Sequence, residues 1–377
     1  MNACPLFPQC GGCSLRMLDE EAYRQKKYAS FKQIITHINQ QDIFFGEPVF
    51  IKDGTRRRAS FTFSFAKKTL HLGFNGAQSH EIIDCDKCLL LTDRLNKNIP
   101  HLRTLLQDLC SEPYIQKKNK KILNQYITSG EVLVSEADNG IDVLFEMPSE
   151  PELNHRMIIA EHLAKLDDVI RVSWHKAKAS SVETILEKTK PMVKNSEVSV
   201  YIPSGTFLQA SKEGEQALIG LVKRYLKNKE GKIADLFCGV GTFSYPLSRN
   251  LNNKILAIDS SEELLTGFRQ SVNRNQIKNI KIESRNLFKY PLDEKELTNI
   301  DVVVFDPPRA GAAAQTAQIS ACLDGPETVI AVSCNPYTFV NDANTLIKGG
   351  YTLKEVTMVD QFIYSSHTEL VALFEKE

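Results

Sequence analysis

The sequence lacks the marks of a membrane or secreted protein. No apolar run approaches the length of a membrane span, and no basic segment followed by an apolar core opens the chain. Internal repeats and low-complexity linkers are also absent. A hydrophobic content of 42% and a charged content of 24% over 377 residues are typical of a globular protein that is long enough for two domains. We therefore expect a cytoplasmic protein with no membrane partner.

The chain also lacks a net charge, because its 46 Lys and Arg residues balance its 46 Asp and Glu residues. The whole chain thus carries no general attraction to nucleic acid. One local cluster differs, since Arg56–Arg58 precedes a segment in which Ala59, Phe61, Phe63 and Phe65 alternate with Ser and Thr. The alternation predicts a half-buried strand entered through three cations that would contact phosphates, with aromatic residues such as Phe61 as further contacts.

The nine cysteines of a cytoplasmic chain argue against a disulfide framework. Five of them fall within residues 1–90, and Cys4, Cys10 and Cys13 form a Cys-x5-Cys-Gly-Gly-Cys motif. Three close thiols beside a flexible glycine pair suit a cluster held by four sulfurs, the fourth from Cys85 or Cys88. A zinc site built from the Cys10/Cys13 and Cys85/Cys88 pairs is the alternative.

Strands and helices alternate after residue 200, which predicts an α/β fold with a mostly parallel sheet and ligands at the carboxyl ends of its strands. The expected strands are Lys232–Leu236, Lys254–Ile258, Ile280–Ser284, Ile300–Phe305 and Thr328–Val332, followed by two adjacent ones, Glu355–Phe362 and Glu369–Phe374. The expected helices begin near Thr242 and cover Ser261–Asn275, Gln315–Leu323 and Tyr337–Leu346. Before residue 200 we expect a helix at Leu95–Leu109 that breaks at Pro100, and a hairpin of Tyr126–Thr128 with Glu131–Glu136.

A glycine turn follows the first of these later strands. Asp235 precedes Gly239 and Gly241 of that turn, and Asp259 ends the next strand. In a nucleotide site such glycines let the backbone approach the ligand, and the second acid accepts from ribose hydroxyls. A dinucleotide site is disfavoured because the third glycine is missing; an acid followed by Gly-x-Gly resembles Rossmann-like methyltransferases that use S-adenosylmethionine. Two prolines after Asp306 fix the exit of a later strand, which leaves this acid where donor and substrate meet.

A thiol and a carboxylate near the C-terminus complete the chemistry. Cys334 follows an apolar strand, and Glu369 opens the last one. Carbon 5 of uracil accepts a methyl group only after a thiolate has added to carbon 6, and a base must then remove the carbon 5 proton. Cys334 suits the first role and Glu369 the second. A free cysteine is more often a small buried hydrophobe, but the Asn-Pro pair after Cys334 argues against that role here.

The order of the motifs resembles that of RNA 5-methyluridine methyltransferases over nearly the whole chain. The motifs are Phe207-Leu208-Gln209, the Asp235–Gly241 loop, Asp306–Gly311, Ser333–Pro336 and His367–Glu369. The resemblance implies Cys334 as nucleophile and Glu369 as base. The donor-site positions, from the resemblance and from the glycine loop together, are Gln209, Phe237, Gly239, Gly241, Thr242, Asp259, Asn286 and Asp306. Asn286 stands where the family has an aspartate near the adenine, and its carbonyl oxygen is expected to accept from the adenine amino group.

The iron–sulfur subset of this family carries the same cysteine motif, with a later ligand that precedes an apolar pair. That similarity implies a [4Fe-4S] cluster on Cys4, Cys10, Cys13 and Cys88, with Cys85 a spare. We expect Cys110, Cys238 and Cys322 to be structural. The small β-barrel module that opens many relatives is expected to be absent.

Together these features predict two domains. Residues 1–200 form a smaller α/β domain for the iron–sulfur cluster and RNA recognition, and residues 201–377 a Rossmann-like methyltransferase domain that binds S-adenosyl-L-methionine. The expected function is methylation of uridine carbon 5 in structured RNA by a monomer. The resemblance favours 23S rRNA, because the cluster-bearing members of the family mostly modify large-subunit RNA. The alternatives are a cytosine-C5 or tRNA uridine methyltransferase, and an RNA-binding or folding factor without catalysis.

Overall fold

The chain divides into two compact units in the computed structural model, which describes residues 4–118, 121–179, 181–227 and 229–376. Unit 1 comprises Met1–Met17, Lys52–Val193 and Ile202–Ser211, and unit 2 comprises Leu18–Ile51, Lys194–Tyr201 and Lys212–Glu377. This division differs from the expected continuous domains 1–200 and 201–377. Its cause is α1 (Glu20–Ile35), whose Phe31 and Ile35 are buried in the core of unit 2.

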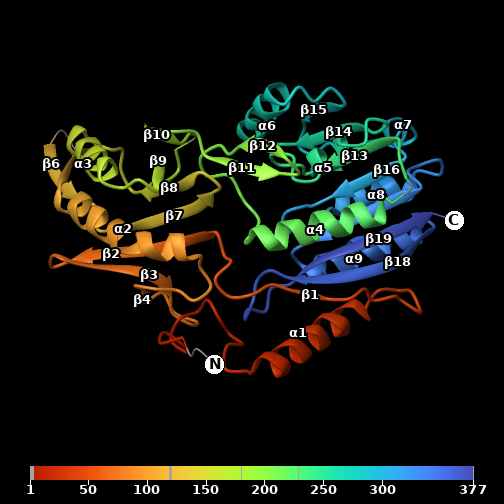
Figure 1. Cartoon of the computed structure of the whole chain (residues 1–377), viewed down its shortest axis with the longest axis horizontal. Helices are drawn as coiled ribbons and strands as arrows, with labels where there is room; N and C mark the ends of the chain where they lie inside the picture. The colour runs from red at the N-terminus through yellow and green to blue at the C-terminus, as the bar shows by residue number, and fades with distance from the viewer. Residues whose placement is uncertain (1–3, 119–120, 180, 228, 377) are drawn as a thin grey trace. The chain divides into compact units, whose positions relative to one another are not determined.

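Unit 1 is built on a seven-stranded sheet in the order β10-β9-β8-β7-β2-β3-β4 (Figure 1). Its strands are β2 (Arg58–Ala66), β3 (Thr69–Asn75), β4 (Ile82–Asp84), β7 (Ser129–Ala137), β8 (Gly140–Met147), β9 (Val169–Lys176) and β10 (Glu183–Glu187). Helices α2 (Asp93–Ser111) and α3 (Leu153–Ala164) share its core. The predicted alternation of β2 is confirmed, because Phe61 and Phe63 are buried and Ser60 is exposed. Two further pairs of strands stand apart from the large sheets: β5 (Pro113–Lys118) with β6 (Lys121–Tyr126), and β11 (Met192–Asn195) with β12 (Val198–Tyr201).

Two local predictions in unit 1 are wrong. Helix α2 runs through Pro100 without a break, because the burial of apolar residues such as Leu95 and Leu106 along one face outweighs the single backbone hydrogen bond that a proline cannot donate. The predicted hairpin does not form either. Strand β6 pairs with β5, whereas β7 lies between β2 and β8.

Unit 2 carries an eight-stranded sheet in the order β1-β18-β19-β17-β16-β13-β14-β15 (Figure 1). Its strands are β1 (Val49–Phe50), β13 (Lys232–Leu236), β14 (Lys254–Asp259), β15 (Ile280–Ser284), β16 (Val302–Phe305), β17 (Thr328–Ser333), β18 (Tyr351–Asp360) and β19 (Glu369–Lys376). Strands β13 to β17 are parallel, whereas β19 runs antiparallel between β17 and β18. The predicted α/β sheet and its final pair of adjacent strands are therefore confirmed.

The helices of unit 2 connect and cover this sheet. They are α1, α4 (Lys212–Tyr225), α5 (Ser244–Ser248), α6 (Glu262–Arg274), α7 (Glu294–Leu297), α8 (Ala313–Ala321) and α9 (Pro336–Lys348). Helices α1, α8 and α9 share one hydrophobic core with the buried strands, while α4 packs against β17, β18 and β19. Within the described ranges, none of the helices is both long and apolar enough to span a membrane.

Candidate active site

The register of two antiparallel strands brings Cys334 and Glu369 together. Ser333, the last residue of β17, pairs with Leu370 in β19, so the next positions along the two strands are Cys334 and Glu369. Glu369 is 2% exposed and Cys334 is half-buried. Burial and then the negative charge of Glu369 raise the pKa of the Cys334 thiol. The proposed nucleophile and base therefore lie next to each other at the carboxyl end of β17.

Asp306 reaches the same end of the sheet from the strand on the other side of β17. Asp306 directly follows β16, which runs parallel to β17. Its backbone N–H donates to the Leu236 carbonyl at 3.2 Å. Burial raises the pKa of Asp306 above the usual range, and burial together with Asp306 raises the pKa of Glu369. The site thus holds two close carboxyl groups that resist ionisation together.

Cys334 is an unactivated thiol in this environment. Burial first, and then Glu369 and Asp306, raise the pKa of Cys334 to about 11, while Arg309 opposes the rise. Arg309 is exposed, and its guanidinium lies 3.4 Å from Nε2 of His367. Formation of the thiolate at neutral pH consequently requires a change in the charges around it.

The backbone at Cys334 is held by the start of helix α9. Asn335 caps this helix by accepting from the Tyr337 N–H at 3.2 Å, and Pro336 occupies its first turn. The Asn335 Nδ2 also donates to the Arg309 carbonyl at 3.0 Å. The motif Ser-Cys-Asn-Pro therefore places a thiol between a strand end and a rigid helix start, and ties it to the Asp306 loop.

Gln361 is a site residue that the sequence reasoning missed. It directly follows β18, it is 4% exposed, and its Nε2 donates to Glu369 Oε2 at 2.8 Å. This hydrogen bond lowers the pKa of Glu369 and so opposes burial. The signal in the sequence was a polar residue at the end of one of the two final strands, opposite the carboxylate that opens the other.

The glycine loop after β13 has the strained backbone expected of a ligand cradle. Phe237 adopts φ 60°, which is uncommon for a residue with a Cβ, and its ring lies 5.4 Å from that of Phe288. Gly241 has φ 95°, and a Cβ there would stand 2.5 Å from the Phe268 ring. Glycine is therefore required at position 241 on two independent grounds.

Asp259 links this loop to the end of β14. Its Oδ2 accepts from the Gly239 N–H at 2.9 Å, and its Oδ1 accepts from the Ser261 N–H at 2.9 Å. Each carboxylate oxygen has a second acceptor position, so Asp259 retains the capacity to accept from ligand hydroxyls. The backbone carbonyl of Thr242 accepts from Asn195 Nδ2 at 3.0 Å, which anchors the far end of the loop.

Asp235 and Asn286 have local partners that constrain their roles. Asp235 is fully buried and accepts from Ser244 Oγ at 2.5 Å; burial raises the pKa of Asp235 to about 7, with Asp306 adding to the rise. The Asn286 Oδ1 accepts from the N–H groups of Phe288 and Lys289, at 3.0 and 3.3 Å. Both lone pairs of that oxygen are thereby used. The Asn286 amide nitrogen, which only donates, could reach an acceptor such as a ring nitrogen of adenine but not its amino group. The role of Asn286 toward the donor stays a prediction.

Comparison of the sequence with known proteins shows the family of this chain. The sequence model of the tRNA (uracil-5-)-methyltransferase family matches residues 19–377. The chain belongs to this family. It is an RNA uracil-5-methyltransferase, as the resemblance of its motifs predicted.

Individual relatives align with nearly the whole of this methyltransferase. An uncharacterized RNA methyltransferase of Mesorhizobium japonicum is 35% identical over 99% of this chain and 84% of its own length. The 23S rRNA (uracil(1939)-C(5))-methyltransferase of Shewanella halifaxensis is 27% identical over 99% and 81%. The crystal structure of the Pyrococcus abyssi tRNA (uracil-54, C5)-methyltransferase with S-adenosyl-L-homocysteine has a TM-score of 0.73 at 21% identity, covering 97% of this chain and 86% of that one. This last likeness confirms the mixed α/β methyltransferase fold.

Gln209 stands in a different unit of the methyltransferase from the other donor-site positions. It lies in Ile202–Ser211 of unit 1, where it is 6% exposed and its backbone carbonyl accepts from Arg57 Nε at 3.1 Å. The guanidinium of Arg58 lies 4.6 Å from the ring centroid of Phe207 in the same segment. The role of Gln209 toward the donor stays a prediction.

The arginine triplet of the methyltransferase is less accessible than its sequence suggested. Arg57 is 5% exposed and Phe61 is fully buried, so the prediction that these two side chains contact RNA is wrong. The reason is the alternation itself, which turns both toward the interior of unit 1. Arg56 and Arg58 are half-buried, and burial lowers the pKa of each guanidinium.

The N-terminal thiols of the methyltransferase gather in unit 1. Cys4, Cys10, Cys13 and Cys88 are half-buried, whereas Cys85 is fully buried, and burial raises the pKa of Cys85 to about 12. Burial raises the pKa of Cys13 and of Cys88; Cys10 and Cys88 add to the rise at Cys13, and Cys4 and Cys10 add to it at Cys88, so the thiols lie within electrostatic range of one another. Across the described ranges, however, no three or more His, Cys, Asp or Glu side chains are grouped as ligands of a metal ion. Cys110, Cys238 and Cys322, which we expected to be structural, are buried.

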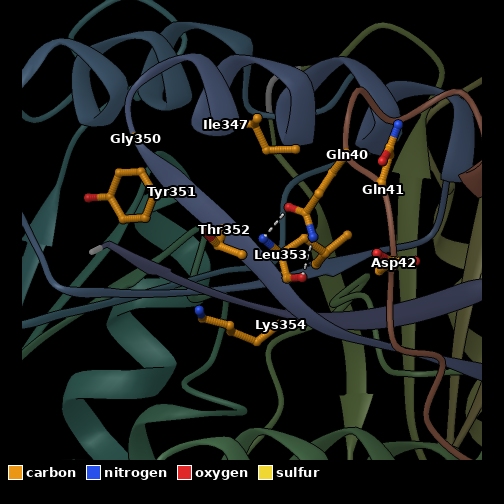
Figure 2. A pocket seen from close by; sticks show the side chains of 9 residues that line it. All are labelled: Gln40, Gln41, Asp42, Ile347, Gly350, Tyr351, Thr352, Leu353 and Lys354. Carbon is orange, nitrogen blue, oxygen red and sulfur yellow. Dashed lines mark hydrogen bonds between the residues drawn. The ribbon is translucent and has the colours of Figure 1, made fainter.

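One cavity of unit 2 lies away from this chemistry. It has a volume of about 520 Å³, and Figure 2 shows its lining at the start of β18 and in the segment after α1. Gln40 donates to and accepts from the backbone of Leu353, at 2.8 and 2.7 Å, as a neighbouring strand would. Glu369 pairs with Val359 near the other end of β18. The cavity therefore lies at the amino end of β18, and the active site lies at its carboxyl end.

Proposed function

We propose that this enzyme transfers a methyl group from S-adenosyl-L-methionine to carbon 5 of a uridine in 23S rRNA, through a covalent bond between Cys334 and carbon 6. The observation that carries the proposal is the adjacency of a half-buried thiol and a fully buried carboxylate at the end of the sheet where the glycine loop also starts. A protein that only bound RNA would need neither group.

The donor site fits the chemistry of S-adenosylmethionine, which supplies an electrophilic methyl group on a sulfonium. Gly239 and Gly241 open the backbone to a ligand, and Asp259 presents acceptor oxygens to ribose hydroxyls. Phe237 and Asn286 would border the adenine, Asp306 would lie beside the methyl group, and Thr242 would complete the set of unit 2. The carboxylates of this site also suit a cationic ligand.

The covalent step begins when the Cys334 thiolate adds to carbon 6 of the uracil. A carbon–sulfur bond forms, the carbon 5–carbon 6 double bond opens, and the electrons pass to an enolate at carbon 4. Carbon 5 then attacks the sulfonium methyl group, and the carbon–sulfur bond of the donor breaks. Arg309 favours the thiolate that starts this sequence, because its charge lowers the pKa of Cys334 against the carboxyl groups.

The product is released when Glu369 removes the proton from carbon 5. The carbon 5–carbon 6 double bond forms again, the bond from carbon 6 to Cys334 breaks, and the thiolate returns to the enzyme. Gln361 orients the carboxylate for this transfer through its hydrogen bond to Oε2. The raised pKa of Glu369 makes it a stronger base than an exposed glutamate once it is ionised.

Ribosomal RNA is the favoured substrate because the relative named for a 23S rRNA uridine aligns with 99% of this chain. The target uridine has to leave its stack to reach a half-buried thiol, which favours loops over duplex RNA. The family description names tRNA instead, so transfer RNA is the second candidate.

Nucleoside mass spectrometry of fractionated rRNA and tRNA from cells that lack the gene tests this function. We expect 5-methyluridine to vanish from one 23S fragment and to return with the wild type and with Cys322→Ala, which removes a buried structural thiol. Cys334→Ala should not restore it. Loss of the nucleoside from tRNA would move the substrate to tRNA, and loss of 5-methylcytidine instead would refute the uridine assignment.

We also propose that Cys4, Cys10, Cys13 and Cys88 hold a [4Fe-4S] cluster in unit 1. The four thiols are half-buried and act on one another electrostatically, and Arg56 lies close enough for Cys13 and Cys88 to affect its pKa. A cluster of four irons spreads its thiolates further apart than a single ion does. The proposal is therefore compatible with side chains that are not grouped around one ion.

A further inference from the structure

Helix α1 carries a buried cation that the reaction as described does not use. Tyr23, Lys27, Phe31 and Ile35 lie four residues apart on its buried face, and Lys27 is only 3% exposed. Burying a lysine costs free energy unless the ammonium group is paired. An apolar side chain of similar volume would stabilise the helix interface at least as well. The presence of lysine at this position therefore points to a role other than packing.

The ammonium group of Lys27 has a partner for each of its three donors. Its Nζ lies 3.0 Å from Oδ1 of Asp360, which is fully buried at the end of β18. The same Nζ donates to the backbone carbonyls of Ser365 and His367, at 2.6 Å in each case. Three donors are all that a lysine has. Lys27 thus joins the end of one strand to the segment that leads into the next.

Tyr23 holds the same segment one helical turn away. Its hydroxyl donates to Asp360 Oδ2 and accepts from the Tyr364 N–H at 2.9 Å. The rings of Tyr23 and Tyr364 lie 4.6 Å apart. Tyr364 has φ 57°, a left-handed conformation that residues with a Cβ adopt only when their surroundings impose it. Helix α1 therefore imposes the shape of residues 361–368.

Both ends of this segment act on the proposed base. Gln361, at its start, donates to Glu369 Oε2, and Glu369 itself follows its last residue. We propose that Lys27 and Tyr23 are positioning residues, which fix residues 361–368 so that the Glu369 carboxylate faces the carbon 5 proton of the methylated adduct. The inference rests on the proposed function, since it concerns the second proton transfer of that mechanism. A shift of the base by about 1 Å costs on the order of 10²-fold in rate.

The two chemical steps separate this role from a purely structural one. A mispositioned base leaves thiolate addition and methyl transfer intact but delays the release of Cys334, so a methylated enzyme–RNA adduct should accumulate. We would follow single turnovers with a donor labelled in its methyl group and a 23S rRNA fragment, and separate free RNA from adduct on denaturing gels. The variants are Lys27→Met and Tyr23→Phe, with Lys26→Met as the matched control at an exposed lysine of the same helix.

We expect label to enter RNA at nearly the wild-type rate in both variants, with adduct release slowed by roughly 10- to 100-fold. Lys26→Met should match the wild type. Equal slowing of both steps, or release at the wild-type rate, would overturn the inference. If Lys27→Met does not fold, Tyr23→Phe decides, because it removes one hydroxyl and keeps the ring.

Glu369→Gln serves as the reference for a missing base. If it traps a labelled adduct while Lys27→Met and Tyr23→Phe release product normally, the positioning role fails and the proposed function stands. If Glu369→Gln traps no adduct and Cys334→Ala stays active, the covalent mechanism itself is wrong, and the positioning role falls with it.

Discussion

Cys334 shows how strongly a few neighbouring charges control one reactive side chain. Burial and two carboxyl groups raise the pKa of its thiol, and Arg309 and a backbone hydrogen bond act in the opposite direction. The N-terminus of α9 is placed where it would favour an anion, yet burial outweighs it. The reactive form of this thiol is therefore scarce at neutral pH in the free enzyme.

The rate of reaction should rise with pH. The pKa of Cys334 is raised to about 11, and the pKa of Glu369 is raised as well, while the active form of each group is the deprotonated one. The raised pKa of Cys334 predicts that kcat/KM increases from about pH 6 to pH 9 and is lost as the pH falls, and Glu369, which acts after methyl transfer, adds the same trend to kcat. Arg309→Gln should move the profile to higher pH. A flat pH profile of kcat/KM over this range would contradict the assignment of Cys334 as nucleophile.

Removal of the base should uncouple the two halves of the reaction. In Glu369→Gln the thiolate still adds to carbon 6 and the methyl group still transfers, but no carboxylate takes the carbon 5 proton. We expect turnover to fall by on the order of 10³-fold or more, with a stable enzyme–RNA adduct visible by mass spectrometry. The double variant with Cys334→Ala should form no adduct, and an adduct in that variant would point to another nucleophile.

At the scale of single elements, the glycine loop after β13 has an unusual backbone conformation at the positions that we assign to the donor site. Phe237, Gly239 and Gly241 all have positive φ within five positions of the chain. The loop is fixed at Asp259 through the Gly239 N–H and closed against Phe268 at Gly241. Such strain persists only where the surrounding structure determines it.

Gly241→Ala tests this element. The new Cβ would stand 2.5 Å from the Phe268 ring at φ 95°, so we expect a loss of about 2 kcal/mol or more in the free energy of unfolding and weaker donor binding. Gly220→Ala in α4 is the matched control, because open space surrounds its Cβ. That change should be neutral or stabilising by up to about 1 kcal/mol. Urea unfolding and donor titration measure both variants, and equal stability of the two would refute the argument.

At the scale of the whole molecule, the chain alternates between its two units instead of completing one before the other. Residues 18–51 belong to unit 2 and contribute α1 and the edge strand β1, while the proposed cluster ligands before and after them, Cys4, Cys10, Cys13 and Cys88, belong to unit 1. Each unit is thus built from segments that lie far apart in the sequence.

The cysteine proposal is tested at this scale by the metal content of the intact enzyme. Anaerobically purified wild type should contain about four irons and four sulfides per chain. Cys13→Ala and Cys88→Ala should lose most of both, whereas Cys110→Ala, a buried thiol of the same unit, should keep them. Stoichiometric zinc without iron would refute the cluster.

Much of unit 2 could be predicted because local patterns carry the information. The apolar runs of β13 to β17 and the caps at Ser261 and Asn335 lie within a few residues of the elements they define. Pro100 and the expected hairpin at residues 126–136 show the limit of this reasoning. Their outcome depended on the packing of a helix face and on strand partners far away in sequence.

The sequence by itself determined the reactive groups and their order along the chain, because a motif such as Ser-Cys-Asn-Pro needs only its neighbours to form a strand end and a helix start. Only the tertiary structure decided that Cys334 lies beside Glu369, through the register of two strands separated by a helix and a further strand. It also decided that α1 secures the segment before the base, and that Arg57 and Phe61 face the interior. Register and burial arise from contacts between distant segments, and no local pattern contains them.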